Sequence, residues 1–235
     1  MNDGDPATEE ADDAIAARLS AVRDRIAQAA QTAGRDPRSV ALVAVSKTHG
    51  IRAVRQALAA GQRLFGENRV QEAASKFPQL RADYPDLQLH LIGPLQTNKV
   101  KDAVALFDVI ETVDRPKLAA KLAEEMQKSG RRPRCYIQIN IGNEPQKAGV
   151  APHDVSALLA LSRDEYRLPV VGLMCIPPAD QDPAPYFAQM AALAKSHQLP
   201  ILSQGMSGDY PAAIAAGATH VRVGTAIFGA RSPIS

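Results

Sequence analysis

The first part of the chain has the hydrophobic pattern of an amphipathic helix. Four apolar residues recur at steps of four, three and four: Ile15, Leu19, Val22 and Ile26. This spacing places them on one helical face, which must pack against the rest of the fold. Thr8 is expected to cap the helix, and Gly34 is expected to end it, since hydroxyls suit N-termini and glycine suits the left-handed residue after a helix.

From residue 40 onward, short β-branched runs alternate with Ala-rich amphipathic segments. The candidate strands are Val40–Ser46, Arg63–Gly66, Leu87–Ile92, Phe107–Glu111, Arg134–Ile141, Pro169–Cys175, Pro200–Ser203 and Thr219–Val223. Helical stretches such as Ile51–Ala60, Arg115–Lys128 and Tyr186–His197 separate them. Strict alternation of this kind indicates parallel strands joined by crossover helices.

Eight such units close a barrel, whereas five or six would form an open doubly wound sheet. The second and seventh strands have the weakest patterns, so the open sheet remains the alternative. We expect an α/β fold of the (β/α)8 TIM barrel type with an extra N-terminal helix. Residues 1–7 are expected to form a disordered acidic tail, and residues 8–235 a single barrel domain.

Composition fits one domain and narrows the function classes. The 235 residues are 46% hydrophobic, with 4% aromatic residues and no tryptophan, which suits an aliphatic core under closely packed helices. The formal charge is +2, from 27 basic and 25 acidic residues that form no basic block. Composition therefore gives no case for nucleic acid or a membrane surface as a partner.

The sequence features that report on cellular location lead us to expect a cytoplasmic protein. The start, MNDGDPATEEADD, lacks the positive charge and apolar run of a secretory signal. No stretch approaches the roughly 20 apolar residues of a membrane span. Cys135 and Cys175 form no CxxC pair and no disulfide framework. Adjacent to Cys175, Met174 points the opposite way along the strand, and core packing is the better interpretation for both.

Ligands of such barrels bind at the carboxyl ends of the strands. Lys47 ends the first predicted strand, ALVAVSK, where a half-buried amine can lose its proton and attack an aldehyde. From position alone, a solvated lysine at a strand end is the better interpretation. Asn68 follows the second strand and either faces the barrel mouth or caps the next helix. Lys147, in the polar loop after the fifth strand, either shapes the entrance or is simply solvated.

The last two units carry the strongest signal. SQGMSGDY follows the seventh strand and VRVGTAIFGAR contains the eighth. Ser207, Gly224 and Thr225 thus lie where small residues and hydroxyls at helix starts form an anion cradle. Phosphate often binds at this place in barrels. Turn and cap chemistry explains either segment alone, but the pair favours a phosphate site.

Several segments are similar to known functional motifs but lack residues that those motifs require. GMSGD lacks the last glycine of a G-x-S-x-G nucleophile elbow. GTAIFGAR has P-loop glycine spacing, but Ala230 and Arg231 replace the Lys-Ser/Thr pair. The five histidines have no metal-ligand spacing. A hydrolase, a nucleotide P-loop and a metal site are therefore not supported.

Five blocks follow one another between Val40 and Arg231: VSKTHG, FGENRVQEA, HLIGPLQTNK, GLMCIPP and LSQGMSGDYPAAIAAGATHVRVGTAIFGAR. As an ordered set they resemble the pyridoxal phosphate (PLP) homeostasis proteins, which are similar to the barrel domain of alanine racemase without its second, β-rich domain. The resemblance implies a barrel of PLP fold type III with PLP as cofactor. It also implies a part in controlling intracellular PLP, with no established catalytic turnover.

The resemblance further implies roles for individual residues. Lys47 matches the lysine that forms the Schiff base, and Asn68 matches a polar residue beside the ring. The phosphate-binding positions match Ser207, Gly224 and Thr225. The sequence departs from the family pattern in the same loop, where Gln204 and Gly208 replace a hydrophobic and an acidic residue.

Arg222 matches the arginine that faces the pyridine nitrogen. A guanidinium only donates and stays protonated, so it would favour the unprotonated ring, a poorer electron sink than a pyridinium. The alternative is a barrel-strand arginine that merely pairs with a carboxylate.

Three functions remain open. The first is a non-catalytic PLP carrier, whose partners are PLP and the PLP-dependent apo-enzymes that would receive it. The second is a PLP-dependent amino-acid racemase, which needs a second proton carrier; Tyr210 and Cys175 are the local candidates. The third is a barrel enzyme acting on another phosphorylated metabolite, with Lys47 as a plain charge. We expect a monomer, with a weak dimer as the alternative.

Overall fold

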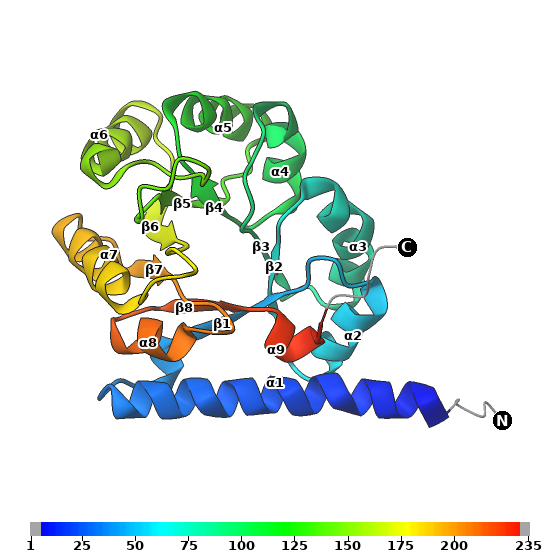
Figure 1. Cartoon of the computed structure of the whole chain (residues 1–235). Helices are drawn as coiled ribbons and strands as arrows, with labels where there is room; N and C mark the ends of the chain where they lie inside the picture. The colour runs from blue at the N-terminus through cyan, green and yellow to red at the C-terminus, as the bar shows by residue number, and fades with distance from the viewer. Residues whose placement is uncertain (1–5, 231–235) are drawn as a thin grey trace.

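The computed structural model describes the backbone of residues 6–230 and the side chains of residues 14–230. Parallel strands β1 to β8 follow one another around a closed barrel, and β1 pairs with β8 to complete it. Figure 1 looks into this ring of strands, with helices around its outside. The prediction of a (β/α)8 barrel is confirmed, and the open sheet is excluded.

The strands match the short apolar runs of the sequence; most are shorter than predicted, while the second and fourth extend past their predicted ends. They are β1 Ala41–Val45, β2 Leu64–Glu67, β3 Gln88–Leu91, β4 Val109–Val113, β5 Arg134–Ile139, β6 Val170–Cys175, β7 Ile201–Ser203 and β8 His220–Val223. The fourth strand begins two residues later than predicted. Phe107 is the C-cap of the preceding helix, and the Asp108 carboxylate accepts hydrogen bonds from the Leu89 main-chain N–H at 2.8 Å and from Arg81 at 2.6 Å.

Each crossover between consecutive strands carries an α-helix. These are α2 Ile51–Ala59, α3 Val70–Asp83, α4 Val100–Leu106, α5 Pro116–Ser129, α6 Val155–Ala160, α7 Ala184–Ser196 and α8 Tyr210–Ala215, and the short α9 Thr225–Phe228 follows β8. Their buried apolar residues face the barrel, as the alternating pattern predicts. Within the described residues, none of these helices combines the length and apolar character needed to cross a bilayer.

The extra helix, α1 (Pro6–Thr32), lies across the outside of the barrel against α8, α9 and α2 (Figure 1). All four residues of its predicted apolar stripe are buried. The prediction for its start is wrong, because the helix already includes Pro6, so Thr8 is not its cap and the last two residues of the expected tail are helical. Residues 1–5 of that tail lie outside the described part. Gly34, at φ 67°, adopts the left-handed conformation expected after the helix.

Candidate functional site

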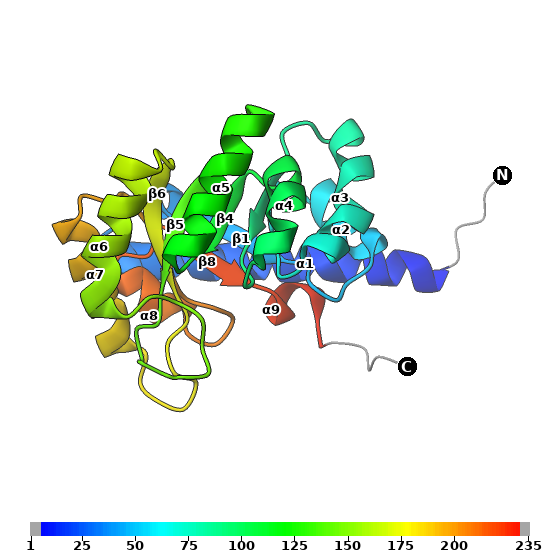
Figure 2. The same cartoon turned by 90° about the horizontal axis from the view of Figure 1, so that it is seen from above.

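A cavity of about 570 Å³ opens at the carboxyl end of the barrel. It is lined by all six of the residues predicted to bind the cofactor, namely Lys47, Asn68, Ser207, Arg222, Gly224 and Thr225. The loops after β5 and β6 project from the same end of the barrel as α9, as Figure 2 shows. Side chains separated by up to 178 positions in the chain, Lys47 to Thr225, therefore meet at one mouth.

Lys47 lies on a turn rather than on the first strand. β1 ends at Val45, and the turn that follows carries the half-buried Lys47 side chain to the cavity wall. The prediction that the strand reaches Lys47 is therefore wrong by two residues. Its position supports the interpretation of a half-buried amine rather than a lysine in bulk solvent.

Asn68 does not cap the helix that follows it. The N-cap position of α3 belongs to Arg69, and no side chain caps that N-terminus. Asn68 lines the cavity instead, and its backbone lies directly against Gly93 in the next loop. A Cβ atom at Gly93 would come within 2.3 Å of the Asn68 carbonyl oxygen. The close approach of these two loops thus requires glycine at position 93.

The substitution Gly93→Ala is expected to displace the Asn68 loop, because two backbone segments cannot both keep their positions. We expect a loss of about 1–3 kcal/mol in the free energy of unfolding, measured by urea denaturation, together with weaker ligand binding at the cavity. Gly208→Ala is the matched control, since Gly208 lines the same cavity and its added Cβ would meet no atom within 4 Å. Equal effects of the two substitutions would contradict this explanation.

The predicted phosphate cradle consists of two turns that follow the neighbouring strands β7 and β8. Ser207 lies in the turn before α8, which is shaped by Gly205 at φ 91° and by the Asp209 carboxylate accepting from the Met206 N–H at 2.6 Å. Gly224 precedes α9, and its added Cβ would come within 3.1 Å of the Val45 carbonyl oxygen. Ser207, Gly208, Gly224 and Thr225 all line the cavity. Their chemistry suits an anion.

Arg222 reaches the cavity from inside the barrel and is almost fully buried. Its Nη1 donates to the Ser203 hydroxyl at 2.7 Å, and its Nη2 donates to the Cys175 carbonyl at 2.8 Å. The Glu111 carboxylate is 4.0 Å from Nη1. Arg222 thus has a carboxylate near its guanidinium, as the alternative interpretation expects, and it also lines the cavity. Its contact with a pyridine nitrogen stays a prediction.

Glu111 is the centre of a buried network that sequence reasoning missed. Its carboxylate accepts from the Ser203 hydroxyl at 2.6 Å and contacts His90 Nδ1 at 2.5 Å. Burial alone would raise the pKa of Glu111, but the His90 hydrogen bond, the His90 and Arg222 charges and the Ser203 hydroxyl lower it overall. An ionised Glu111 fixes the orientation of Arg222 through Ser203. The signal in the sequence was a carboxylate within the apolar run VIETV, which forms β4.

Two further cavity residues come from β5 and its loop. Gln138 donates through Nε2 to the Ala148 carbonyl at 3.2 Å, while its buried Oε1 has no hydrogen-bond partner among the described residues. Lys147 donates to the Pro177 carbonyl at 3.0 Å and pairs with Glu144. Lys147 is therefore not simply solvated, and Gln138 offers an acceptor at the cavity wall.

The remaining candidates from the sequence lie away from the cavity wall. Cys175 and Met174 are both buried in the core, as predicted, and in separate apolar clusters. Burial raises the pKa of the Cys175 thiol to about 12, although the Arg222 charge opposes the shift. Tyr210 is buried, and Arg25 lies 5.5 Å from the centroid of its ring. Among the described residues, no group of three His, Cys, Asp or Glu side chains could hold a metal.

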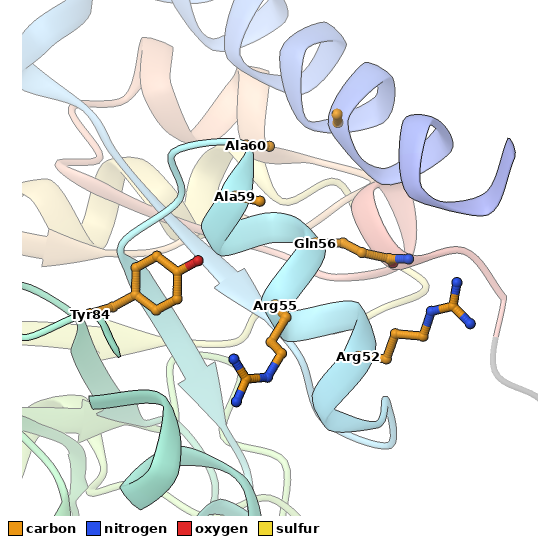
Figure 3. A pocket seen from close by; sticks show the side chains of 7 residues that line it. Arg52, Arg55, Gln56, Ala59, Ala60 and Tyr84 are labelled. Carbon is orange, nitrogen blue, oxygen red and sulfur yellow. The ribbon is translucent and has the colours of Figure 1, made fainter. Parts of the chain in front are cut away.

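A second hollow, of about 520 Å³, lies on the outer wall between α1 and α2 (Figure 3). Arg52, Arg55 and Gln56 extend from α2 along it, and Tyr84 closes one side. Arg55 is already paired with Asp83 at 2.9 Å. Because none of the six predicted residues lines this hollow, the carboxyl-end cavity is the candidate site.

Comparison with known proteins places the chain in a family. The family model for the alanine racemase N-terminal domain matches residues 17–232. The pyridoxal phosphate homeostasis protein of Pseudomonas aeruginosa is 45% identical over 226 residues, covering 92% of this chain and 96% of its own length. The protein of the same name from Escherichia coli K12 is 41% identical over 226 residues, covering 92% of this chain and 97% of its own.

Solved structures support the same family assignment. The PLP-bound structure of PipY from Synechococcus elongatus has a TM-score of 0.80 and 41% identity, and the match covers 92% of this chain and all of that one. An alanine racemase from Clostridium difficile has a TM-score of 0.69 at 17% identity, covering 95% of this chain and 58% of that one. This second similarity concerns the fold alone. The chain belongs to the pyridoxal phosphate homeostasis proteins, whose barrel is the alanine racemase N-terminal domain.

Proposed function

We propose that this protein binds pyridoxal 5′-phosphate reversibly, holds it as a Schiff base on Lys47, and takes part in intracellular PLP homeostasis. The observation that carries the proposal is the gathering of an amine, an anion cradle and a buried arginine around one cavity of about 570 Å³. The relatives named for PLP homeostasis and the PLP-bound PipY structure support the choice of ligand.

The residues present fit PLP by the chemistry of their donors. Ser207, Gly224 and Thr225 would hold the phosphate, and Asn68 would lie beside the ring. Gln138 Oε1, buried and without a partner among the described residues, would accept a hydrogen bond from a hydroxyl of the ligand. Each distinct group of PLP thus has a suitable residue in the cavity wall.

When bound, PLP supplies an aldehyde that condenses with an amine and a ring that withdraws electrons. Lys47 would present its neutral Nζ to that aldehyde and hold PLP as a Schiff base, with one water released on condensation and taken up again on hydrolysis. Arg222, held by Ser203 and the Cys175 carbonyl, would donate to the pyridine nitrogen. A donor that stays protonated disfavours a pyridinium, so the bound ring would stabilise carbanions poorly.

The positions of the two proton-carrier candidates favour a carrier over a racemase. Racemisation by two bases needs a proton carrier on each face of the ring. Neither Cys175 nor Tyr210 is among the side chains that line the cavity. Cys175 would also remain a thiol, since its pKa is about 12. We therefore propose PLP-dependent apo-enzymes as the recipients of the cofactor, rather than amino acids as substrates.

The PLP-loaded protein is expected to give cofactor to a PLP-dependent apo-enzyme without racemising amino acids. The first readout is the recovered activity of the apo-enzyme on addition of loaded protein. The second is the optical activity of L-alanine and other amino acids during long incubation, with free PLP as the blank. Sustained racemisation above that blank, lost in Lys47→Ala, would overturn the carrier function in favour of a racemase.

A further inference from the structure

A second lysine is buried beside the turn that carries Lys47. Lys76, on α3, is only 5% exposed. Its Nζ lies 3.0 Å from the Ser46 carbonyl oxygen and 3.1 Å from the His49 carbonyl oxygen. These two carbonyls bracket the turn from Ser46 to His49. The ammonium therefore ties the two ends of the Lys47 turn to one point on α3.

Two carboxylates hold that ammonium from the other side. Glu67, the last residue of β2, contacts Lys76 Nζ through Oε1 at 2.6 Å, and Glu72 on α3 does so at 3.0 Å. Glu67 Oε1 also accepts from the Ser46 hydroxyl at 2.6 Å. Burial raises the pKa of Glu67, while the Lys76 charge and hydrogen bond and the Ser46 hydroxyl oppose that shift. The end of β2 is thus connected to the start of the turn.

The turn itself has a conformation that needs such support. Thr48, next to Lys47, has φ 67°, a left-handed conformation that β-branched residues rarely adopt. The Glu72 carboxylate accepts from the Thr48 main-chain N–H at 2.5 Å. Strained residues of this kind persist only where the surroundings fix them, and they cluster at functional sites.

Stability alone does not account for this cluster. A buried ion pair is commonly no more stabilising than apolar residues of the same volume, because desolvation offsets the attraction. All four Nζ contacts of Lys76 are to the turn or to carboxylates that also contact the turn. Lys76 is also not among the residues that line the cavity. The geometry suits a role exerted through the turn, with no contact to the ligand.

We propose that Lys76 is a positioning residue for Lys47: with Glu67 and Glu72 it holds the Ser46–His49 turn so that the Lys47 amine meets the ligand aldehyde at the cavity wall. This inference rests on the proposed function. The proposal distinguishes Schiff-base formation at Lys47 from phosphate binding. Phosphate binding uses other loops and should not depend on Lys76.

The test compares two ligands on Lys76→Met. PLP can form a Schiff base, whereas 4′-deoxypyridoxine 5′-phosphate has the same phosphate and ring but no aldehyde. Lys76→Met is expected to weaken PLP binding by about tenfold while the affinity for the deoxy analogue stays within about twofold of wild type. Both dissociation constants are measured by fluorescence titration, and the adduct by its visible absorbance.

Two further variants keep the result interpretable. Glu72→Gln, at a position that is partly exposed, removes the charge that pairs with Lys76 and leaves the Thr48 N–H a weaker, uncharged acceptor. It should shift the ratio of the two affinities in the same direction, even where Lys76→Met folds poorly. Arg81→Met breaks a half-buried ion pair with Asp108 at the amino end of β4 and should leave that ratio unchanged. The positioning role would be overturned if Lys76→Met and Glu72→Gln kept the wild-type ratio of PLP affinity to deoxy-analogue affinity. An equal fall in the affinities for both ligands would give that same ratio.

The wild-type protein tests the proposed function independently of the role of Lys76. A wild-type protein that binds PLP no more tightly than the deoxy analogue, and forms no borohydride-stable adduct, would contradict the Schiff base itself. A wild-type protein that prefers PLP, with variants that keep this preference, would contradict only the role of Lys76.

Discussion

Lys47→Met is expected to yield a colourless protein with no borohydride-stable PLP adduct. The substitution removes the one atom proposed to bond the aldehyde while keeping the apolar stem of the side chain in the turn. The phosphate contacts at the Ser207 and Thr225 turns remain, so binding should weaken rather than vanish. We expect a loss of roughly a hundredfold in PLP affinity, or about 2.7 kcal/mol of binding free energy, measured by titration.

Lys147→Met is the matched control, because Lys147 lines the same cavity but its Nζ is engaged with the Pro177 carbonyl and Glu144. This variant should keep its colour and its adduct. If the visible band survived in Lys47→Met and disappeared in Lys147→Met, the amine would have been assigned to the wrong loop.

Glu111→Ala is expected to cost about 3–5 kcal/mol of unfolding free energy, the usual effect of removing one partner from a buried charged group. The side chain is fully buried. Its loss would leave Arg222 without a nearby carboxylate, and the Ser203 hydroxyl and His90 without their shared partner. The free energy follows from urea denaturation.

Glu124→Ala is the control, since Glu124 is an exposed carboxylate on α5 that pairs with Lys121 and Lys128. This substitution should change the free energy of unfolding little.

The loss of unfolding free energy in Glu111→Ala should also depend on pH. Because the folded-state pKa of Glu111 lies below its ordinary 4.5, its stabilisation is present above that value and is lost as the pH falls through the folded-state pKa. A cost that stayed the same at neutral and acidic pH would show that the carboxylate charge is not what matters.

The barrel could be predicted from the sequence because strict alternation of short apolar runs and amphipathic helices leaves few topologies. Strand ends were less certain, since they depend on tertiary contacts. Asp108, for example, ends the loop before β4 by bonding Leu89 and Arg81, and no local pattern reveals such partners. The start of α1 was misjudged for a related reason: a capping residue such as Thr8 is a signal only where the helix actually begins.

The six candidate site residues could be located from the carboxyl ends of the strands and from the family resemblance. The buried residues that surround these six could not be located from the sequence. Glu111 on β4 lies beside Arg222, Lys76 on α3 contacts the Lys47 turn, and Gln138 on β5 lines the cavity. Each looked like an ordinary strand or helix residue in sequence. Asn68 illustrates the converse, because its capping interpretation was reasonable locally and failed only once Arg69 was found at the N-cap. Polar residues within apolar strands were the signal that deserved more weight.

The Schiff base on Lys47 can be tested by borohydride reduction of the PLP-loaded wild-type protein, followed by peptide mapping. We expect one phosphopyridoxyl group, on the peptide that contains ALVAVSKTHG, with the added mass on Lys47. A stable adduct on Lys147, Lys76 or any other lysine, or no adduct at all under saturating PLP, would contradict it.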